Sequence, residues 1–364
     1  MKSLKMVLIY ICLFIILCIS GCVKKTEQIY GLTIDDSWYE SVRLEEVVLS
    51  LEKLRVKPTV RVVMSADTKP REYADLFEKL HKVAYIMAEP VDSYEMNLYK
   101  DVESYRKRFE ESKKYLGDYV DIWEIGNEVN GLDWIREDSE FIVEKIKAAY
   151  EAVEGDKAKV AITFYYENPE YNKDMFEWIR MYVPKDLMEN TDYSLISYYE
   201  DDNEGYEPDW KEVFAEFEKL FPNAKIGIGE CGNTANTADD ESKISMINKY
   251  YKMPKYTDNY IGGYFWWNYV KDCIGEEKEH IACIRKFTGN PMRITQYMFC
   301  RKSRKPQSHD LYGHLCRVKR KTPSPAHILR TERPKPRDLV DAATQLICAA
   351  NCSGKAFPPL LCHL

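Results

Sequence analysis

The chain has 364 residues, of which 45% are hydrophobic and 30% are charged. This composition is that of a folded protein and excludes a disordered or collagen-like chain. The formal net charge of −7 argues against a nucleic-acid-binding protein, because such proteins need a basic surface. The charge is unevenly distributed, however. Residues 284–364 hold 16 Lys and Arg against 4 Asp and Glu, whereas residues 1–283 hold 36 against 55.

The first 22 residues have the pattern of a secretory signal. Two lysines precede an apolar run at residues 6–19, and Ser20, Gly21 and Cys22 follow it. The run is too short to span a hydrocarbon core of ~30 Å comfortably. Its ending resembles a lipoprotein signal, which implies that Cys22 becomes the lipid-bearing first residue. We therefore predict an extracytoplasmic protein anchored to the membrane through Cys22; an ordinary signal peptide, which would give a secreted protein, and a short membrane anchor are the alternatives.

Short runs rich in Val, Ile, Tyr and Phe alternate with longer amphipathic segments from residue 29 onward. The short runs lack strict alternation of polar and apolar residues, as expected for strands that are buried on both faces. They predict strands at residues 30–34, 59–64, 83–88, 120–125, 160–164, 193–199, 225–229 and 261–267.

Between these runs, apolar residues recur at the spacing of a helix. Gly155, Pro222 and Asn223 stand where helices are expected to end. The predicted apolar stripes are Leu44, Val47, Val48, Leu51 and Leu54; Ile142, Ile146, Ala149 and Val153; and Trp210, Val213, Phe214, Phe217 and Phe221.

Eight strands that alternate with helices predict an α/β fold of the (β/α)8 TIM barrel type. The predicted catalytic domain, residues 23–283, is close to the ~250 residues typical of this barrel. A doubly wound open sheet also alternates strands and helices, but no Gly-rich phosphate loop follows the first strand. We therefore favour the barrel.

The sequence changes character after about residue 283. The barrel needs a helix after its eighth strand, and residues 276–283 begin such a pattern. The chain then becomes basic, loses its periodicity and accumulates Pro and Cys, which leaves the last helix doubtful. Residues 284–364 are either a disordered basic extension or non-native sequence, for example the product of a frameshift. The second interpretation is favoured because composition and pattern change together.

The eleven cysteines do not indicate a disulfide framework. Three lie within residues 1–22 and five beyond residue 299, so that only Cys231, Cys273 and Cys283 fall in the acidic body. No pair has the spacing of a zinc site. We predict neither a structural metal nor a cofactor.

Two of the predicted strands end in carboxylates. Asn127 and Glu128 follow the fourth strand, and Glu230 follows the seventh. Barrel active sites lie at the C-terminal ends of the strands, so both side chains are expected at one rim. Hydrolysis of a glycosidic bond needs two such carboxylates: one protonates the leaving oxygen and the other attacks the anomeric carbon.

This arrangement resembles clan A of the glycoside hydrolases, the retaining group also called the 4/7 superfamily, and is most similar to its family 5. The resemblance covers roughly residues 29–270. It implies that Glu128 is the acid/base, that Glu230 is the nucleophile and that Asn127 holds the sugar 2-hydroxyl.

Other strand ends extend the resemblance. Arg61 matches the arginine that braces the nucleophile, although a plain salt bridge inside the barrel is the alternative. Tyr199 matches the tyrosine that hydrogen-bonds the nucleophile, and Trp267 matches the tryptophan beneath the sugar subsite. Two positions depart from the family: Ser197 stands where a histidine is usual, and the third strand ends in Glu89 without the expected histidine. These departures concern the family and the sugar, and they leave the catalytic pair in place.

Several other rim residues have two interpretations. Trp38 and Asp36 follow the first strand and are predicted to bind substrate; core packing of Trp38 and helix capping by Asp36 are the alternatives. Glu124 is predicted to be an ion-pair partner. Trp266 and Trp267 point to opposite sides of their strand, so that one packs under helices and the other is able to face sugar.

Together these features predict a monomeric, lipid-anchored, extracytoplasmic retaining β-glycosidase that acts on β-linked oligosaccharides or polysaccharides. A retaining mechanism requires the carboxyl groups of Glu128 and Glu230 to be about 5–5.5 Å apart. The alternative is a non-catalytic surface lipoprotein that binds glycans on a degenerate barrel. A transglycosylase on the same scaffold has the same pattern, and the sugar, the linkage and endo or exo action stay open.

Overall fold

The computed structural model describes residues 28–38, 41–155, 157–171, 173–274, 282, 284 and 285. Eight parallel strands form a closed barrel in which each strand pairs with its neighbours in the sequence, and β8 pairs with β1. The predicted (β/α)8 barrel is confirmed. The strands are β1 (Ile29–Ile34), β2 (Thr59–Val63), β3 (Tyr85–Glu89), β4 (Ile122–Gly126), β5 (Lys159–Tyr165), β6 (Tyr193–Tyr198), β7 (Lys225–Gly232) and β8 (Tyr260–Trp267).

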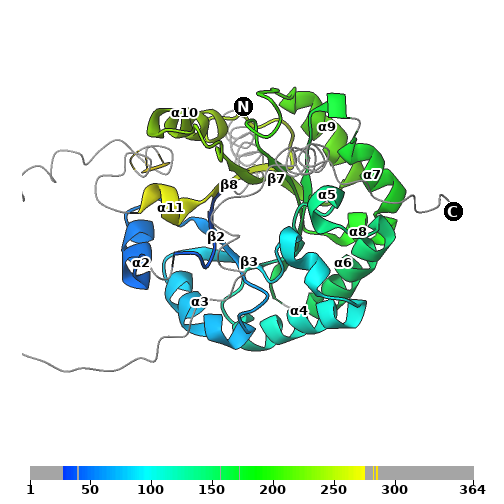
Figure 1. Cartoon of the computed structure of the whole chain (residues 1–364), viewed down its shortest axis with the longest axis horizontal. Coiled ribbons are helices and arrows are strands. Elements are labelled where there is room, and N and C mark those ends of the chain that lie inside the picture. The colour runs from blue at the N-terminus through cyan, green and yellow to red at the C-terminus, as the bar shows by residue number, and fades with distance from the viewer. Residues whose placement is uncertain are drawn as a thin grey trace, which may run out of the picture.

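Helices surround the barrel as an outer ring (Figure 1). The predicted apolar stripes face inward; Ile142, Ile146 and Ala149, for example, are fully buried. The helices are α2 (Leu44–Glu52), α3 (Ala74–His81), α4 (Val102–Leu116), α5 (Leu132–Ile135), α6 (Ser139–Val153), α7 (Met175–Tyr182), α8 (Lys185–Asn190), α9 (Trp210–Leu220), α10 (Asp240–Tyr250) and α11 (Tyr269–Cys273).

The observed strand boundaries differ from the predicted ones by up to three residues; the seventh strand, for example, extends to Gly232 and not only to residue 229, so that Glu230 lies within it. The third strand begins at Tyr85 and not at Val83, because the backbone N–H groups of Val83 and Ala84 still donate to the carbonyl of Leu80 at the end of α3. Helix starts have a local cause, since Asp174 and Asp209 accept backbone N–H groups in the first turns of α7 and α9.

The inside of the barrel changes from apolar to charged along its axis. Near the N-terminal ends of the strands it is filled by an apolar cluster that includes Ile29, Ile122, Leu195 and Phe265. Gly31 makes room for this packing, because a Cβ atom there would lie 2.5 Å from Cγ of Phe265. Towards the C-terminal ends, charged side chains replace the apolar ones, and the candidate site begins there.

The seam between β8 and β1 is covered in part by α11. The hydroxyl groups of Tyr269 on α11 and Ser50 on α2 lie 2.7 Å apart, and Ile284 is fully buried in the core. Residues 275–281 and 283, the tail from residue 286 and the signal segment with Cys22 lie outside the described residues. The predicted domain limits therefore stay predictions.

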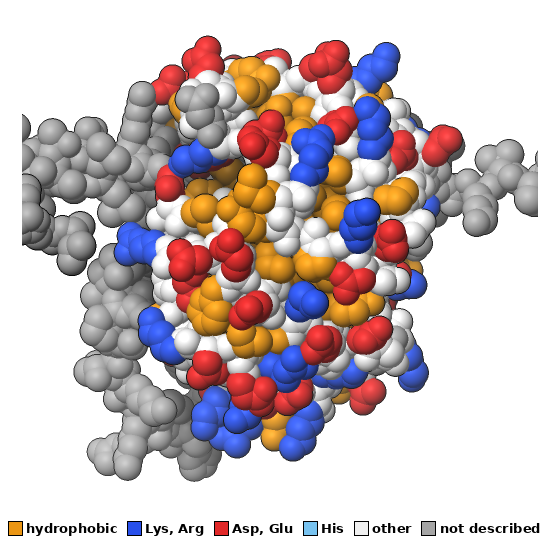
Figure 2. Space-filling view, turned by 90° about the vertical axis from the view of Figure 1, so that its right-hand side faces the viewer, with side chains coloured by type: hydrophobic (Ala, Val, Ile, Leu, Met, Phe, Trp, Pro, Cys, Tyr) orange, Lys and Arg blue, Asp and Glu red, His pale blue; other side chains and the backbone are white. Residues whose placement is uncertain are grey.

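Figure 2 shows the side of the barrel around α7, where acidic and basic side chains are interspersed with apolar ones. Some of the charges pair across helices, as Arg180 on α7 does with Glu216 on α9. Within the described residues, no helix is both long enough and apolar enough to cross a membrane.

Candidate active site

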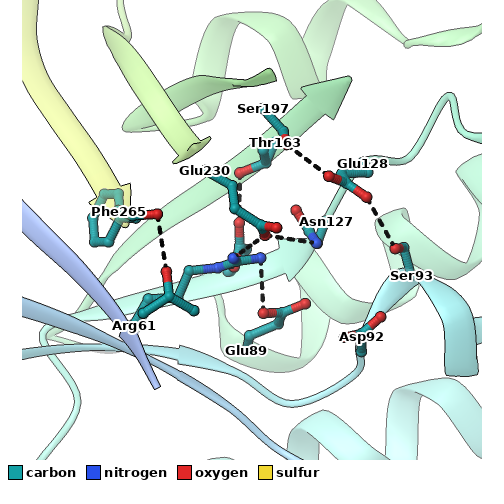
Figure 3. Close-up of polar contacts among 12 residues, drawn as sticks. Arg61, Glu89, Asp92, Ser93, Asn127, Glu128, Thr163, Ser197, Glu230 and Phe265 are labelled. Atoms are coloured by element: carbon teal, nitrogen blue, oxygen red, sulfur yellow. Dashed lines mark hydrogen bonds and ion pairs between the residues drawn. The ribbon is translucent and has the colours of Figure 1, made fainter. Parts of the chain in front are cut away.

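Glu128 and Glu230 both lie at the C-terminal end of the barrel. Glu128 follows β4 directly, and Glu230 belongs to the last part of β7. Their side chains lie on either side of Asn127 (Figure 3), and the two residues are only 1% and 0% exposed. The barrel thus places the two predicted catalytic carboxylates in one buried polar site.

The backbone at Glu128 has an unusual conformation. Its φ of 48° is in the left-handed region, which costs a residue with a Cβ atom about 1–3 kcal/mol. Backbone hydrogen bonds hold the turn: Val129 donates to the carbonyl of Thr163 at 3.2 Å, and Gly131 donates to the carbonyl of Glu128 at 2.8 Å. This turn directs the carboxylate of Glu128 into the site.

Three donors hold the carboxylate of Glu230. The Tyr199 hydroxyl donates to Oε1 at 2.5 Å, and Asn127 Nδ2 lies 3.5 Å from Oε2. Arg61 Nη1 pairs with the same Oε2 atom. The contacts that the sequence predicts for Arg61 and Tyr199 are therefore present, and together they fix the orientation of Glu230.

Arg61 is the centre of a larger buried ion cluster. Its Nε atom lies 2.6 Å from Glu124 and its Nη2 atom 2.8 Å from Glu89, and all three side chains are 0% exposed. Burial alone would lower the pKa of Arg61, but the charges of Glu124, Glu89 and Glu230 raise it well above its usual value. Glu124 is thus the ion-pair partner that the sequence predicts.

Two serines contact Glu128. The Ser197 hydroxyl donates to Oε1 at 2.6 Å, and the Ser93 hydroxyl lies 3.4 Å from Oε2. Ser93 itself accepts a hydrogen bond from the indole of Trp134 at 3.1 Å. No pattern in the sequence marks Ser93, which begins a short 3-10 helix (Ser93–Leu98) after β3. Ser197, which departs from the family pattern, contacts the predicted acid/base directly.

Replacing Ser197 with alanine should slow the hydrolysis step by about 10–100-fold, since a hydrogen bond to a charged group contributes ~1.5–3 kcal/mol. The rate is measured with an activated aryl glycoside, for which hydrolysis of the glycosyl-enzyme is the slow step. Ser194→Ala is the matched control, because Ser194 lies on the same strand, is fully buried, and its hydroxyl has no hydrogen bond within the described part of the chain. Equal rates for the two variants would contradict a role for Ser197 in holding Glu128.

The tryptophans of β8 point to opposite sides. Trp266 is fully buried and donates from its indole to Asp272 at 3.0 Å, so it packs under the helices. Trp267 is half-buried. Of the two tryptophans, it is therefore the one that is able to face a sugar.

The two predicted binding residues after β1 are enclosed. Trp38 is 3% exposed and belongs to the core between sheet and helices, which favours the packing interpretation. Asp36 accepts a hydrogen bond from the Tyr73 hydroxyl at 3.0 Å. It does not cap the next helix, because the residue at the start of α2 is Arg43.

Comparison with solved structures shows what this barrel is similar to. A glucosidase from Croceicoccus marinus aligns with a TM-score of 0.51 and 13% identity over 72% of this chain and 67% of that one. A β-glucosidase from Thermotoga maritima aligns with a TM-score of 0.45 and 13% identity over 66% and 88%. Gas2p from Saccharomyces cerevisiae in complex with laminaritetraose and laminaripentaose aligns with a TM-score of 0.46 and 14% identity over 73% and 64%.

No protein-family model matches the sequence, and no curated protein matches it. Two of these three neighbours are glucosidases. At 13% identity the likeness to the Croceicoccus glucosidase shows the fold, which is the (β/α)8 barrel that the strand order already establishes.

Proposed function

We propose that the protein is a retaining β-glycosidase with Glu230 as nucleophile and Glu128 as acid/base. One observation carries the proposal: two buried carboxylates at the C-terminal end of the barrel have different surroundings. Glu230 is held by a guanidinium and a phenol, whereas the partners described for Glu128 are two serine hydroxyls. Different surroundings suit carboxylates that have different roles.

In the first step, a carboxylate oxygen of Glu230 attacks the anomeric carbon while Glu128 donates its proton to the departing oxygen. The bond to the leaving group breaks as the glycosyl ester forms. Arg61 and Tyr199 keep the attacking carboxylate in one orientation. Asn127 lies beside Glu230, where the family resemblance assigns it to the sugar 2-hydroxyl.

In the second step, the ionised Glu128 takes a proton from a water molecule, which attacks the anomeric carbon and releases Glu230. The positive charge of Arg61 then stabilises Glu230 as a leaving carboxylate. Two inversions give net retention, which requires the two carboxyl groups to stand about 5–5.5 Å apart. A separation near 9 Å would indicate inversion instead.

A substrate panel tests the proposal. Purified protein is assayed with aryl β-glycosides of several sugars and with β-glucan, mannan and xylan, and the anomer released first is recorded. We expect hydrolysis of at least one β-linked substrate with release of the β-anomer. Binding of a glycan without hydrolysis of any substrate would favour the non-catalytic glycan-binding protein.

We also propose that the protein is anchored outside the cytoplasm through a lipid on Cys22. Gln28 precedes β1 and thus lies at the N-terminal end of the barrel. The six residue steps from Cys22 to Gln28 reach at most about 20 Å. An anchor there would hold this end near the membrane and leave the two carboxylates at the far end. Labelled fatty acid should enter the wild-type chain and not the Cys22→Ser variant; equal labelling would contradict the anchor.

A further inference from the structure

Arg61 lies among more carboxylates than it can neutralise. Glu89 on β3, Glu124 on β4 and Glu230 on β7 all contact its guanidinium, and all four side chains are 0% exposed. Three ionised carboxylates against one guanidinium would leave two uncompensated negative charges on fully buried side chains. Buried charge without a partner is strongly unfavourable, and such a site commonly takes up a proton.

The hydrogen bonds of the three carboxylates differ. Glu230 accepts from Tyr199 and Asn127 as well as from Arg61. Glu124 accepts from Arg61 Nε at 2.6 Å and from the Thr163 hydroxyl at 2.5 Å. Burial raises the pKa of Glu124, but Arg61 and the hydrogen bond from Thr163 oppose this shift. Hydrogen bonds donated to a carboxylate favour its ionised form, so Glu124 and Glu230 are the two of the three that the site is best able to keep charged.

Glu89 lacks such support. It lies 2.8 Å from Arg61 Nη2, but in the described part of the chain neither of its carboxyl oxygens forms a hydrogen bond of normal geometry. We propose that Glu89 holds a proton at neutral pH, as a neutral acid that leaves the charge of Arg61 to Glu124 and Glu230. Glu89 is then a positioning residue, and it stands at the strand end where the family has a histidine.

The charged groups around Glu89 support this assignment. Burial raises the pKa of Glu89 well above its usual value, Arg61 opposes the shift, and the charges of Glu124, Asp92 and Glu230 add to it. Asp92 follows β3 in the loop. From α4, Arg108 donates to the carbonyl of Pro90 at 2.9 Å, and its remaining hydrogen bonds go to other backbone carbonyls.

Tyr105, also on α4, is fully buried near this cluster, where burial raises its pKa well above its usual value. It therefore stays a neutral phenol, whose hydroxyl donates to the carbonyl of Ile125 at 3.1 Å. Tyr105 therefore adds no negative charge to the surroundings of Glu89, and Arg61 is the cation of the ion cluster.

The neutral state of Glu89 also suits the reaction, a point that rests on the proposed function. When Glu230 becomes a glycosyl ester it loses its charge, and Arg61 is then balanced by Glu124 alone. With Glu89 protonated, the cluster changes from a net charge of −1 to 0. The proton on Glu89 thus keeps the Arg61 cluster of the glycosyl-enzyme free of uncompensated charge.

The first test compares the thermal stability of wild type and Glu89→Gln, whose amide reproduces the neutral acid. Below about pH 4.5 the folded and unfolded chains both hold the proton of Glu89. Above it the unfolded chain ionises while the folded chain keeps the proton, so wild-type stability falls relative to the variant. The Tm of Glu89→Gln minus that of wild type should therefore rise by about 3 °C per pH unit between pH 5 and 7.

Glu110→Gln is the control, because Glu110 is exposed on α4 and its Tm difference should stay flat over the same range. If Glu89 is instead ionised and paired with Arg61, the folded and unfolded chains both lack its proton above about pH 5. The difference for Glu89→Gln then stays as flat as that of the control between pH 5 and 7, which overturns the proposal.

Infrared difference spectra at pH 7 provide a second measurement that needs no substrate. Wild type minus Glu89→Gln should contain the carbonyl band of a protonated carboxyl group, and its absence would overturn the proposal.

In kinetics, the wild-type profile of kcat/KM against pH should contain an alkaline ionisation that Glu89→Gln lacks. Because stability and infrared spectra do not depend on turnover, an inactive protein would contradict the proposed function and still leave the protonation of Glu89 decided.

Discussion

Replacing Glu230 with alanine should abolish hydrolysis of every substrate, with kcat lower by a factor on the order of 10⁶, as when the nucleophile of a covalent catalyst is removed. Both chemical steps need this carboxylate, the first as nucleophile and the second as leaving group. The fold should survive, because Arg61 keeps Glu124 as its ion-pair partner. Steady-state kinetics together with circular dichroism measure the two properties separately.

Glu170→Ala is the control for this loss. Glu170 follows β5 at the same end of the barrel and is exposed, so its replacement should leave kcat within about twofold of wild type. Substantial activity of a folded Glu230→Ala variant would show that another group is the nucleophile.

Replacing Arg61 with alanine should destabilise the protein by about 3–5 kcal/mol at pH 7, because it leaves buried carboxylates without their cation. A loss of this size is a large part of the whole stability of a typical domain. It should shrink as the pH falls towards 5, because burial and mutual repulsion raise the pKa values of the remaining carboxyls and protonation removes their charge. Denaturation midpoints measured from pH 5 to pH 8 test this dependence.

Arg108→Ala provides the matched control. Arg108 is also buried, but it donates to the backbone carbonyls of Pro90, Thr68 and Ser65. Its loss leaves backbone carbonyls without donors but leaves no carboxylate without its cation. Because carbonyls do not titrate, the destabilisation should stay nearly constant over the same pH range. A pH-independent loss in Arg61→Ala as well would contradict the charge balance assigned to the cluster.

The alternation of strands and helices could be predicted because each element is specified locally. The inward faces of α6 and α9 are continuous apolar stripes, and Asp209 marks the start of α9. The starts of the third and fourth strands are harder to predict, since hydrogen bonds such as that from Val83 to Leu80 continue the last turn of the preceding helix. Apolar composition does not distinguish the last turn of a helix from the start of a buried strand.

Glu128 and Glu230 could be predicted because a carboxylate coincides with a strand end. Arg61 lies in the middle of β2, and its contact with Glu230 could be predicted only from the family resemblance. The position of Ser93 beside Glu128 depends on the path of the loop after β3. The burial of Glu89 depends on barrel closure, which brings β2, β3, β4 and β7 around one guanidinium. Neither feature leaves a pattern in the sequence.

The assignment of the two carboxylates is tested most directly by azide rescue with an activated aryl β-glycoside. Glu128→Ala should still form the glycosyl-enzyme, because a good leaving group needs little protonation, and hydrolysis should slow by about 10²–10⁴ for want of a base. Azide needs no base, so it should restore turnover of this variant and release the β-glycosyl azide. With Glu230→Ala, azide should enter the vacant nucleophile position and give the α-glycosyl azide. The opposite pairing of anomers would show that the two roles are reversed, and a failure of azide to rescue either variant would contradict the glycosidase itself.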